Sequence, residues 1–152
     1  MNLWMGSLLI LFLVLMTFSA LFSSSETVFF SLGPLGLRRL SQRRPDAGKR
    51  VHTVISQPTR LLSTVLIGNT IVNVGIAAVG YAIAEHFFPG RGERISIPVV
   101  TMLLVIFCEA GPKRLGLLLN EPLAVVFAPI ILLLTRLFTP LRLMMEYITR
   151  AF

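Results

Sequence analysis

Five oxygen-bearing side chains interrupt the apolar stretches of this 152-residue chain, and together they could bind a small cation. They are Ser23, Ser25, Asn69, Asn73 and Glu109. Hydroxyl, amide and carboxylate oxygens suit hard cations: Mg²⁺ prefers octahedral oxygen ligands, and Ca²⁺ takes more of them at longer distances. Glu109 would supply the main charge. The single cysteine and the two histidines form no group with the ligand spacing of a zinc site.

Each of these residues also has a purely structural interpretation. Serines in membrane helices often bond back to their own backbone, and asparagines often hold helices together. A shared depth favours the cation site instead. At a rise of about 1.5 Å per residue, Asn69 and Asn73 lie roughly 12 and 18 Å beyond Leu61, and Glu109 lies roughly 20 Å beyond Ser96. A carboxylate within a membrane is by default a functional hypothesis.

Composition places these residues in a membrane protein. Hydrophobic residues make up 55% of the chain and charged residues only 14%, whereas a soluble domain carries about 25% charged residues. Met1–Ser25 and Leu61–Ala84 contain no charged side chain, and a helix of roughly 20 apolar residues crosses a bilayer. The first stretch lacks the basic start of a signal peptide, so we predict a retained helix.

Two further uncharged stretches, Ile95–Cys108 and Pro122–Thr135, are each only 14 residues long, too short to span alone. The first is either re-entrant or continues through Glu109, and Gly111-Pro112 predicts that its helix ends or kinks there. We predict an amphipathic helix at the membrane surface for the second, with a fourth span as the alternative. Arginines that suit anionic lipid follow it: Arg136, Arg142 and Arg150.

The sequence therefore predicts an all-α membrane protein with a single transmembrane domain over residues 1–152. We expect spans at about 5–30, 61–86 and 95–112, and short cytoplasmic helices broken at Gly33-Pro34 and Arg44-Pro45. An amphipathic juxtamembrane helix should follow at about 121–150.

Basic residues predict the orientation. Between the first two spans stand seven basic residues against the single acid Asp46: Arg38, Arg39, Arg43, Arg44, Lys49, Arg50 and Arg60. The positive-inside rule places this loop in the cytoplasm and the N-terminus outside. Binding of nucleic acid is a much rarer use of such a loop beside a membrane helix, so we expect none. We find no nucleotide loop and no catalytic triad, and we expect no enzyme.

Three segments resemble the transmembrane domain of the CorC and cyclin M (CNNM) family of magnesium transport proteins. Phe22–Ser31 reads F-S-S-S-E-T-V-F-F-S, Leu66–Asn73 reads L-I-G-N-T-I-V-N and Cys108–Lys113 reads C-E-A-G-P-K. The family motifs are F-S-G-S-E-T-A-F-F-S, L-I-G-N-x-x-V-N and G-E-I-V-P-K. This chain departs from them at Ser24 and Cys108, where glycine is usual, and at Ala110-Gly111, where the family has two aliphatic residues.

The resemblance implies a homodimer of three-helix domains in a bacterial-type inner (plasma) membrane, each with a juxtamembrane helix and a Mg²⁺ site near the three motifs. It implies Mg²⁺ export, with Na⁺ entry as a candidate coupling. Family members continue into cytosolic CBS domains that bind ATP. These domains are expected in the full-length protein and are absent from this chain, so regulation by nucleotide should be absent too. Two alternatives stay open: an anchor and dimerisation module that regulates another transporter, and a Na⁺ or Ca²⁺ carrier using the same oxygens.

Overall fold

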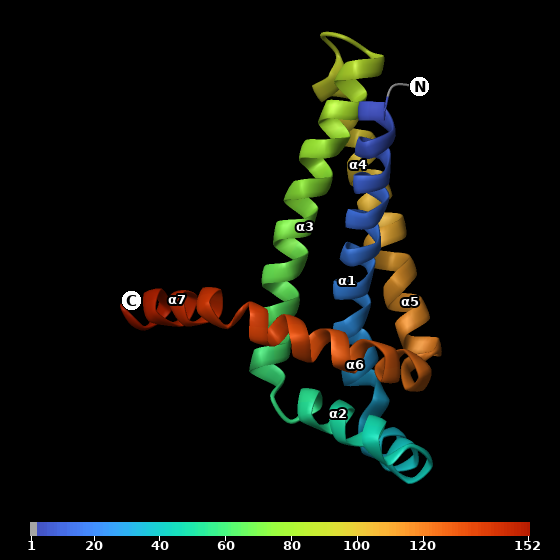
Figure 1. Cartoon of the computed structure of the whole chain (residues 1–152), viewed down its shortest axis with the longest axis vertical. Helices are drawn as coiled ribbons and strands as arrows, with labels where there is room; N and C mark the ends of the chain where they lie inside the picture. Colours follow the sequence, from blue (N-terminus) through green and yellow to red (C-terminus); the bar gives the residue numbers. More distant parts are fainter. Residues whose placement is uncertain (1–2) are drawn as a thin grey trace. The chain divides into compact units, whose positions relative to one another are not determined.

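The computed structural model describes residues 3–152, and all of its regular elements in that range are helices. The predicted all-α class is thereby confirmed. In chain order the elements are α1 (Leu3–Arg43), α2 (Pro45–Ile55), α3 (Pro58–Phe87), α4 (Gly92–Leu103), the π-helix η1 (Leu104–Ala110), α5 (Gly111–Leu118), α6 (Asn120–Leu137) and α7 (Thr139–Arg150) (Figure 1).

Four helical segments are long and apolar enough to cross a membrane. Three of them contain the predicted spans: α1, α3 and the continuous run Gly92–Leu118 formed by α4, η1 and α5. The fourth is α6, over Asn120–Leu137. These helices make the chain a multi-pass membrane protein.

The helices form two compact units. The first comprises the chain up to Ser24 together with Gly68–Arg114, and the second comprises Ser25–Ile67 together with Leu115–Phe152. Because the unit boundaries fall within α1 and α3, each of these helices contributes one part to each unit.

In the first unit, α1 and α3 pack antiparallel along their shared length (Figure 1). Contacts pair falling residue numbers on α1 with rising numbers on α3: Phe22 with Gly68, Ser19 with Asn73, Leu15 with Gly75, Phe12 with Gly80, and Trp4 with His86. A side chain at position 68 would clash with the Phe22 ring, so glycine is needed there for the close approach. α4 joins the pair through Val100, which packs on Gly80.

We predict that the third apolar helix ends or kinks at Gly111-Pro112; in the structure the run continues through this pair but changes helix type there. The seven residues of η1 form a π-helix, and α5 begins directly at Gly111. The Gly111 N–H bonds to the Ile106 carbonyl, five residues earlier. A Cβ at position 111 would lie 2.9 Å from that oxygen, so glycine permits the wide turn. Pro112 then falls in the first turn of α5, where a missing N–H is tolerated.

In the second unit, both predicted breaks of the basic segment are present. Gly33 adopts φ 65°, a left-handed value that glycine tolerates, just before Pro34. α2 begins at Pro45, directly after Arg44 leaves helical geometry. α2 packs against α6.

The predicted helix at 121–150 is wrong as a single element, because two helices, α6 and α7, meet at Phe138. Pro140 explains the break: it lacks an N–H and its ring would clash with a carbonyl one turn earlier. The ends of α6 contact two different helices. Asn120 bonds to Ser31 of α1 at 3.2 and 3.3 Å, and the Thr135 hydroxyl lies 3.1 Å from that of Thr64 on α3. α6 therefore runs from α1 to α3 rather than alongside either (Figure 1).

Candidate cation site

Ser19 stands at the centre of a polar cluster inside the first unit. It is fully buried on α1, and its hydroxyl lies 2.6 Å from the Asn73 Oδ1 and 3.2 Å from the Asn69 Oδ1. Asn69 and Asn73 are one helical turn apart on α3, so both amides reach the same side. A hydroxyl carries a single hydrogen. Two carbonyl oxygens therefore converge on one donor, which leaves unused lone pairs at this point.

Ser23 adds another oxygen one turn further along α1. Its side chain is only 4% exposed, and its Oγ has no hydrogen-bond partner among residues 3–152. Burial of an unsatisfied hydroxyl costs about 1–3 kcal/mol, and a cation would remove that cost. Ser24 follows the structural interpretation instead, because its hydroxyl donates to the Ala20 carbonyl at 2.8 Å.

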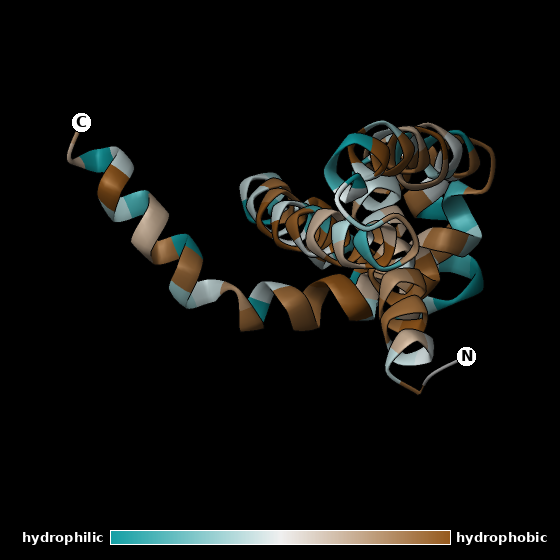
Figure 2. Cartoon of the chain, turned by 90° about the horizontal axis from the view of Figure 1, so that it is seen from above, coloured by the Kyte–Doolittle hydropathy of each residue, from teal (hydrophilic) through white to brown (hydrophobic). Residues whose placement is uncertain are grey.

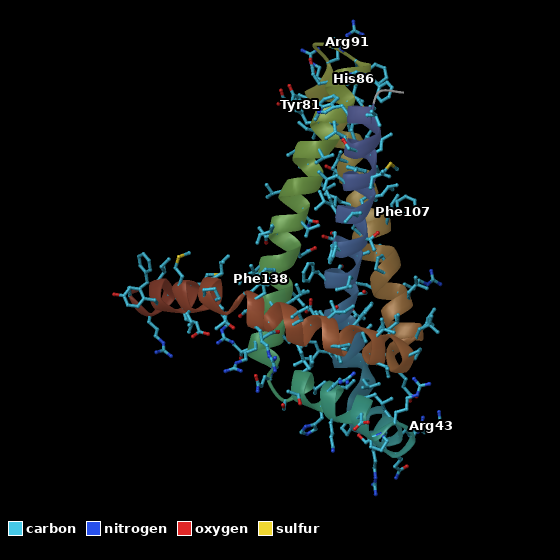
Figure 3. All side chains as sticks on the ribbon, in the orientation of Figure 1. Arg43, Tyr81, His86, Arg91, Phe107 and Phe138 are labelled. Atoms are coloured by element: carbon cyan, nitrogen blue, oxygen red, sulfur yellow. The ribbon has the colours of Figure 1, made fainter. Side chains whose placement is uncertain are left out.

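η1 lies against this cluster through Cys108. The thiol is fully buried and donates to the Met16 carbonyl of α1 at 3.7 Å. Glu109 follows on the next residue and is half-buried. Phe107, the residue before Cys108, is exposed and points outward (Figure 3).

Glu109 directly follows Cys108 but forms no hydrogen bond with the cluster in the described residues. Within residues 3–152 no hydrogen bond links its carboxylate to Ser19 or to either asparagine, and no basic side chain pairs with it. Glu109 directly follows Cys108, and its carboxylate has no ion pair with a basic side chain in the described range.

The π-turn also frees a backbone oxygen. In an α-helix the Phe107 carbonyl would accept from the Gly111 N–H, but that N–H is directed at Ile106. In a π-helix its donor would be residue 112, which is a proline without an N–H. The Phe107 carbonyl therefore lacks a helical donor. Such carbonyls are tolerated at membrane depth where they line a polar cavity.

The described residues 3–152 contain no group of three or more His, Cys, Asp or Glu side chains that could hold a metal ion. The cluster of Ser19, Ser23, Asn69 and Asn73 is instead built from neutral oxygens. This is the donor chemistry of a hard cation rather than of zinc.

Comparison with known proteins identifies the domain. The family model described as the cyclin M transmembrane N-terminal domain matches residues 9–152. The chain belongs to this CNNM family. The resemblance seen in the three motifs is thereby confirmed.

Relatives of the chain occur in bacteria and plants. The UPF0053 inner membrane protein YfjD of Escherichia coli is 33% identical over 132 residues, which cover 87% of this chain and 31% of the relative. A UPF0053 protein of Haemophilus influenzae is 29% identical over 147 residues, covering 97% and 35%. A chloroplastic DUF21 domain-containing protein of Arabidopsis thaliana is 33% identical over 103 residues, covering 68% and 16%. The chain thus spans about a third of the two bacterial relatives.

The structure brings together two of the five residues that the sequence singled out, Asn69 and Asn73. Asn69 and Asn73 meet at Ser19, and Ser23 lies one turn along the same side of α1. Ser25 is buried but belongs to the second unit. Two helical steps turn the side-chain direction by about 200°, so Ser25 and Ser23 face different sides of α1.

Sequence reasoning missed Ser19, the best-connected member of the cluster. It lies outside the F-S-S-S-E-T segment, so the family motif does not point to it. A signal was available nevertheless. Ser19 precedes Ser23 by four residues, which places both on one helix face.

Proposed function

We propose that this CNNM-family membrane domain transports Mg²⁺ through a site formed by Ser19, Ser23, Asn69, Asn73 and Glu109. The observation that carries the proposal is the convergence of neutral side-chain oxygens in the cluster. Two amide oxygens share the Ser19 hydrogen, and the buried Ser23 hydroxyl has no partner among residues 3–152. A bound cation satisfies all of these oxygens at once, and Glu109 supplies the opposite charge.

Mg²⁺ is the ion that fits the chemistry and the family resemblance together. It requires near-octahedral oxygen ligands and gives up its water reluctantly. The freed Phe107 carbonyl and the Glu109 carboxylate would replace part of that water. Export, with coupling to Na⁺ entry, is carried over from the family resemblance and belongs to the same proposal.

The proposed topology has three spans with the N-terminus outside. α1, α3 and the run Gly92–Leu118 cross the membrane, and the basic segment Arg38–Arg60 is cytoplasmic. α6 is apolar enough to span, but its contacts with both Ser31 and Thr64 support a course along the inner surface. Arg43→Cys and Arg91→Cys should therefore react with an impermeant thiol reagent from opposite sides of the membrane. Labelling from one side would contradict three spans.

A homodimer is part of the proposal, because three helices form a thin wall around a polar pathway. Light scattering of the purified protein in detergent should give the mass of two chains. A mass of one chain for a transport-competent sample would remove the dimer from the mechanism.

Transport is tested with the purified chain in liposomes that contain a Mg²⁺-sensitive dye. The parent should carry Mg²⁺ down its gradient, and an opposing Na⁺ gradient should change the rate if the two ions are coupled. Glu109→Gln should abolish the flux. Glu93→Gln is the matched control, because Glu93 is exposed in the first turn of α4.

Two results would favour the alternatives. No flux by the parent, or equal flux by Glu109→Gln, would favour the anchor and dimerisation module. A flux that Ca²⁺ or Na⁺ supports better than Mg²⁺ does would assign the same oxygens to a different ion.

A further inference from the structure

A hollow of about 620 Å³ lies where the end of α1 meets α2, within the second unit. The two helices approach each other closely here, because a Cβ at Gly48 would clash with the hydroxyl and the Cα of Ser41. The volume falls in the range of about 300–1,000 Å³ that is typical of small-molecule sites. The residues that line the hollow are Leu37, Ser41, Pro45, Gly48, Lys49, His52 and Thr53.

α2 lines this hollow with its polar side. Lys49, His52 and Thr53 are exposed, and they share one side of the helix because they are three or four residues apart. The apolar residues Val51 and Val54 are buried, and α2 packs against α6. α6 is mostly hydrophobic along its length (Figure 2). The apolar side of α2 is thus used for packing, and its polar side is available to a ligand.

Three groups in the hollow have hydrogens to donate and no partner within residues 3–152. The Lys49 ammonium, the His52 imidazole and the Ser41 hydroxyl form no ion pair and no side-chain hydrogen bond in that range. Thr53 differs, because its hydroxyl donates to the Lys49 carbonyl at 2.9 Å. No acidic side chain of the described chain lines the hollow, and Asp46 lies outside its lining. A set of donors that includes a cation suits a phosphate group.

The surroundings of the hollow indicate a ligand that comes from water rather than a lipid. Leu35 and Leu62 are exposed, but no large apolar side chain between them is exposed in the described chain. This stretch therefore offers no apolar surface on which acyl chains could lie. Leu37 and Pro45 supply apolar surface inside the hollow itself. The hollow can thus accommodate a small organic group together with a phosphate.

We propose that this hollow binds a small, soluble phosphomonoester. Lys49 supplies the charge opposite the phosphate, and Ser41 and His52 donate to its other oxygens. Leu37 and Pro45 contact the organic part of the ligand. The basic segment around the hollow attracts the anion. The inference does not rest on the proposed ion transport, because no residue of the cation site lines this hollow.

The test uses the full chain in nanodiscs of phosphatidylcholine, with fluorophenyl phosphate as the probe. Binding is measured by the broadening of the fluorine NMR signal as protein is added. Fluorophenol, which lacks the phosphate, should not bind. Inorganic phosphate, which lacks the ring, should compete about tenfold more weakly than phenyl phosphate does, because burial of the ring adds affinity.

Lys49→Gln removes the charge that lines the hollow. The affinity for the probe should fall on the order of tenfold, as expected for the loss of a charge-assisted hydrogen bond. Arg50→Gln is the matched control, because Arg50 is the next residue of α2, is exposed and does not line the hollow. It removes the same charge from the same segment and should keep the affinity within about twofold of the parent, since salt screens exposed charges. Circular dichroism measures whether both variants keep the helix content of the parent.

Four outcomes would overturn the inference. Absence of probe binding by the parent would show that there is no site for a phosphomonoester. Equal losses in Lys49→Gln and Arg50→Gln would show general attraction by the basic segment. Inorganic phosphate that competes as well as phenyl phosphate would show a site for the free ion. Greater displacement of the probe by phosphatidylglycerol in the discs than by the same amount of oleate, which has the charge without the phosphate, would show that a lipid headgroup fills the hollow.

Discussion

Asn120 in the second unit and Asn73 in the first both meet a serine of α1, yet they present opposite ends of the amide to it. The Asn120 nitrogen donates to the Ser31 carbonyl and hydroxyl. The Asn73 oxygen instead accepts from the Ser19 hydroxyl, which Asn69 also approaches with its oxygen. Donors and acceptors are matched at Asn120, and acceptors are in excess at Asn73.

A second pair of contacts gives the same contrast. In the second unit, the Thr64 hydroxyl donates to the Arg60 carbonyl and can still accept from Thr135. In the first unit, the buried Ser23 hydroxyl has no partner in the described chain. The same residue types therefore fasten helices in one unit and converge without enough hydrogens in the other. We propose that the balance of donors and acceptors, rather than residue type, distinguishes a residue that joins helices from one that binds a cation.

The largest expected effect is that of Glu109→Ala. Loss of the carboxylate that we propose as the charged ligand should weaken Mg²⁺ binding on the order of a hundredfold or more, measured by calorimetry on the chain in nanodiscs. Glu121→Ala, which removes a carboxylate from the second unit, is the control and should bind as the parent does. Parent-like binding by Glu109→Ala would place the ion elsewhere.

Substitution of Asn73 and of Asn120 tests the difference between the two units directly. Asn73→Ala should weaken Mg²⁺ binding about tenfold, since it removes one neutral oxygen ligand. Asn120→Ala should leave binding unchanged and lower the free energy of unfolding by about 1 kcal/mol, as expected for a hydrogen bond between membrane helices. Binding by calorimetry and unfolding in detergent measure the two quantities. Equal effects of both variants on binding would remove the distinction between the units.

Ser19→Ala should have a smaller effect on the ion, about a fivefold loss of affinity. The substitution removes one oxygen but leaves the two amide oxygens available. The matched variant is Thr135→Val, which removes a helix-joining hydroxyl of the second unit. It should lower stability alone, and a loss of Mg²⁺ affinity in it would show that the unfolding free energy controls both measurements.

Glu85 offers the smallest expected effect on the ion and sharpens the comparison within the first unit. Its carboxylate accepts from the N–H groups of Gly90 and Gly92 at 2.7 and 2.9 Å, so its acceptors are already satisfied. Glu85→Gln should lower the free energy of unfolding by about 1 kcal/mol with unchanged Mg²⁺ affinity. A large loss of affinity would mean that the loop between α3 and α4 takes part in ion binding.

The sequence by itself determined the class of the protein, the family and the positions of three long apolar helices. These conclusions rest on the length of the apolar runs, the low content of charged residues and the three motifs. Each of these is a property of one segment of sequence, and none depends on contacts with another segment. The breaks at Gly33-Pro34 and at Pro45 follow for the same reason, because glycine and proline restrict their own backbone.

The tertiary structure alone decided how the helices are turned toward one another. Ser19 became the centre of the cluster and Ser25 was separated from it because contact depends on rotation about the helix axis, which hydropathy does not report. The π-turn before Gly111 shifts the phase of the helix, so that Cys108 faces α1 and the Phe107 carbonyl loses its donor. Pro140 is compatible with a break in the helix, but only the tertiary contacts at both ends of α6, with Ser31 and with Thr64, show that α6 is separate from α7. Helix rotations and breaks of this kind depend on the fit between two packed surfaces. Those surfaces come from segments that are distant in the sequence, so neither segment alone determines the contact.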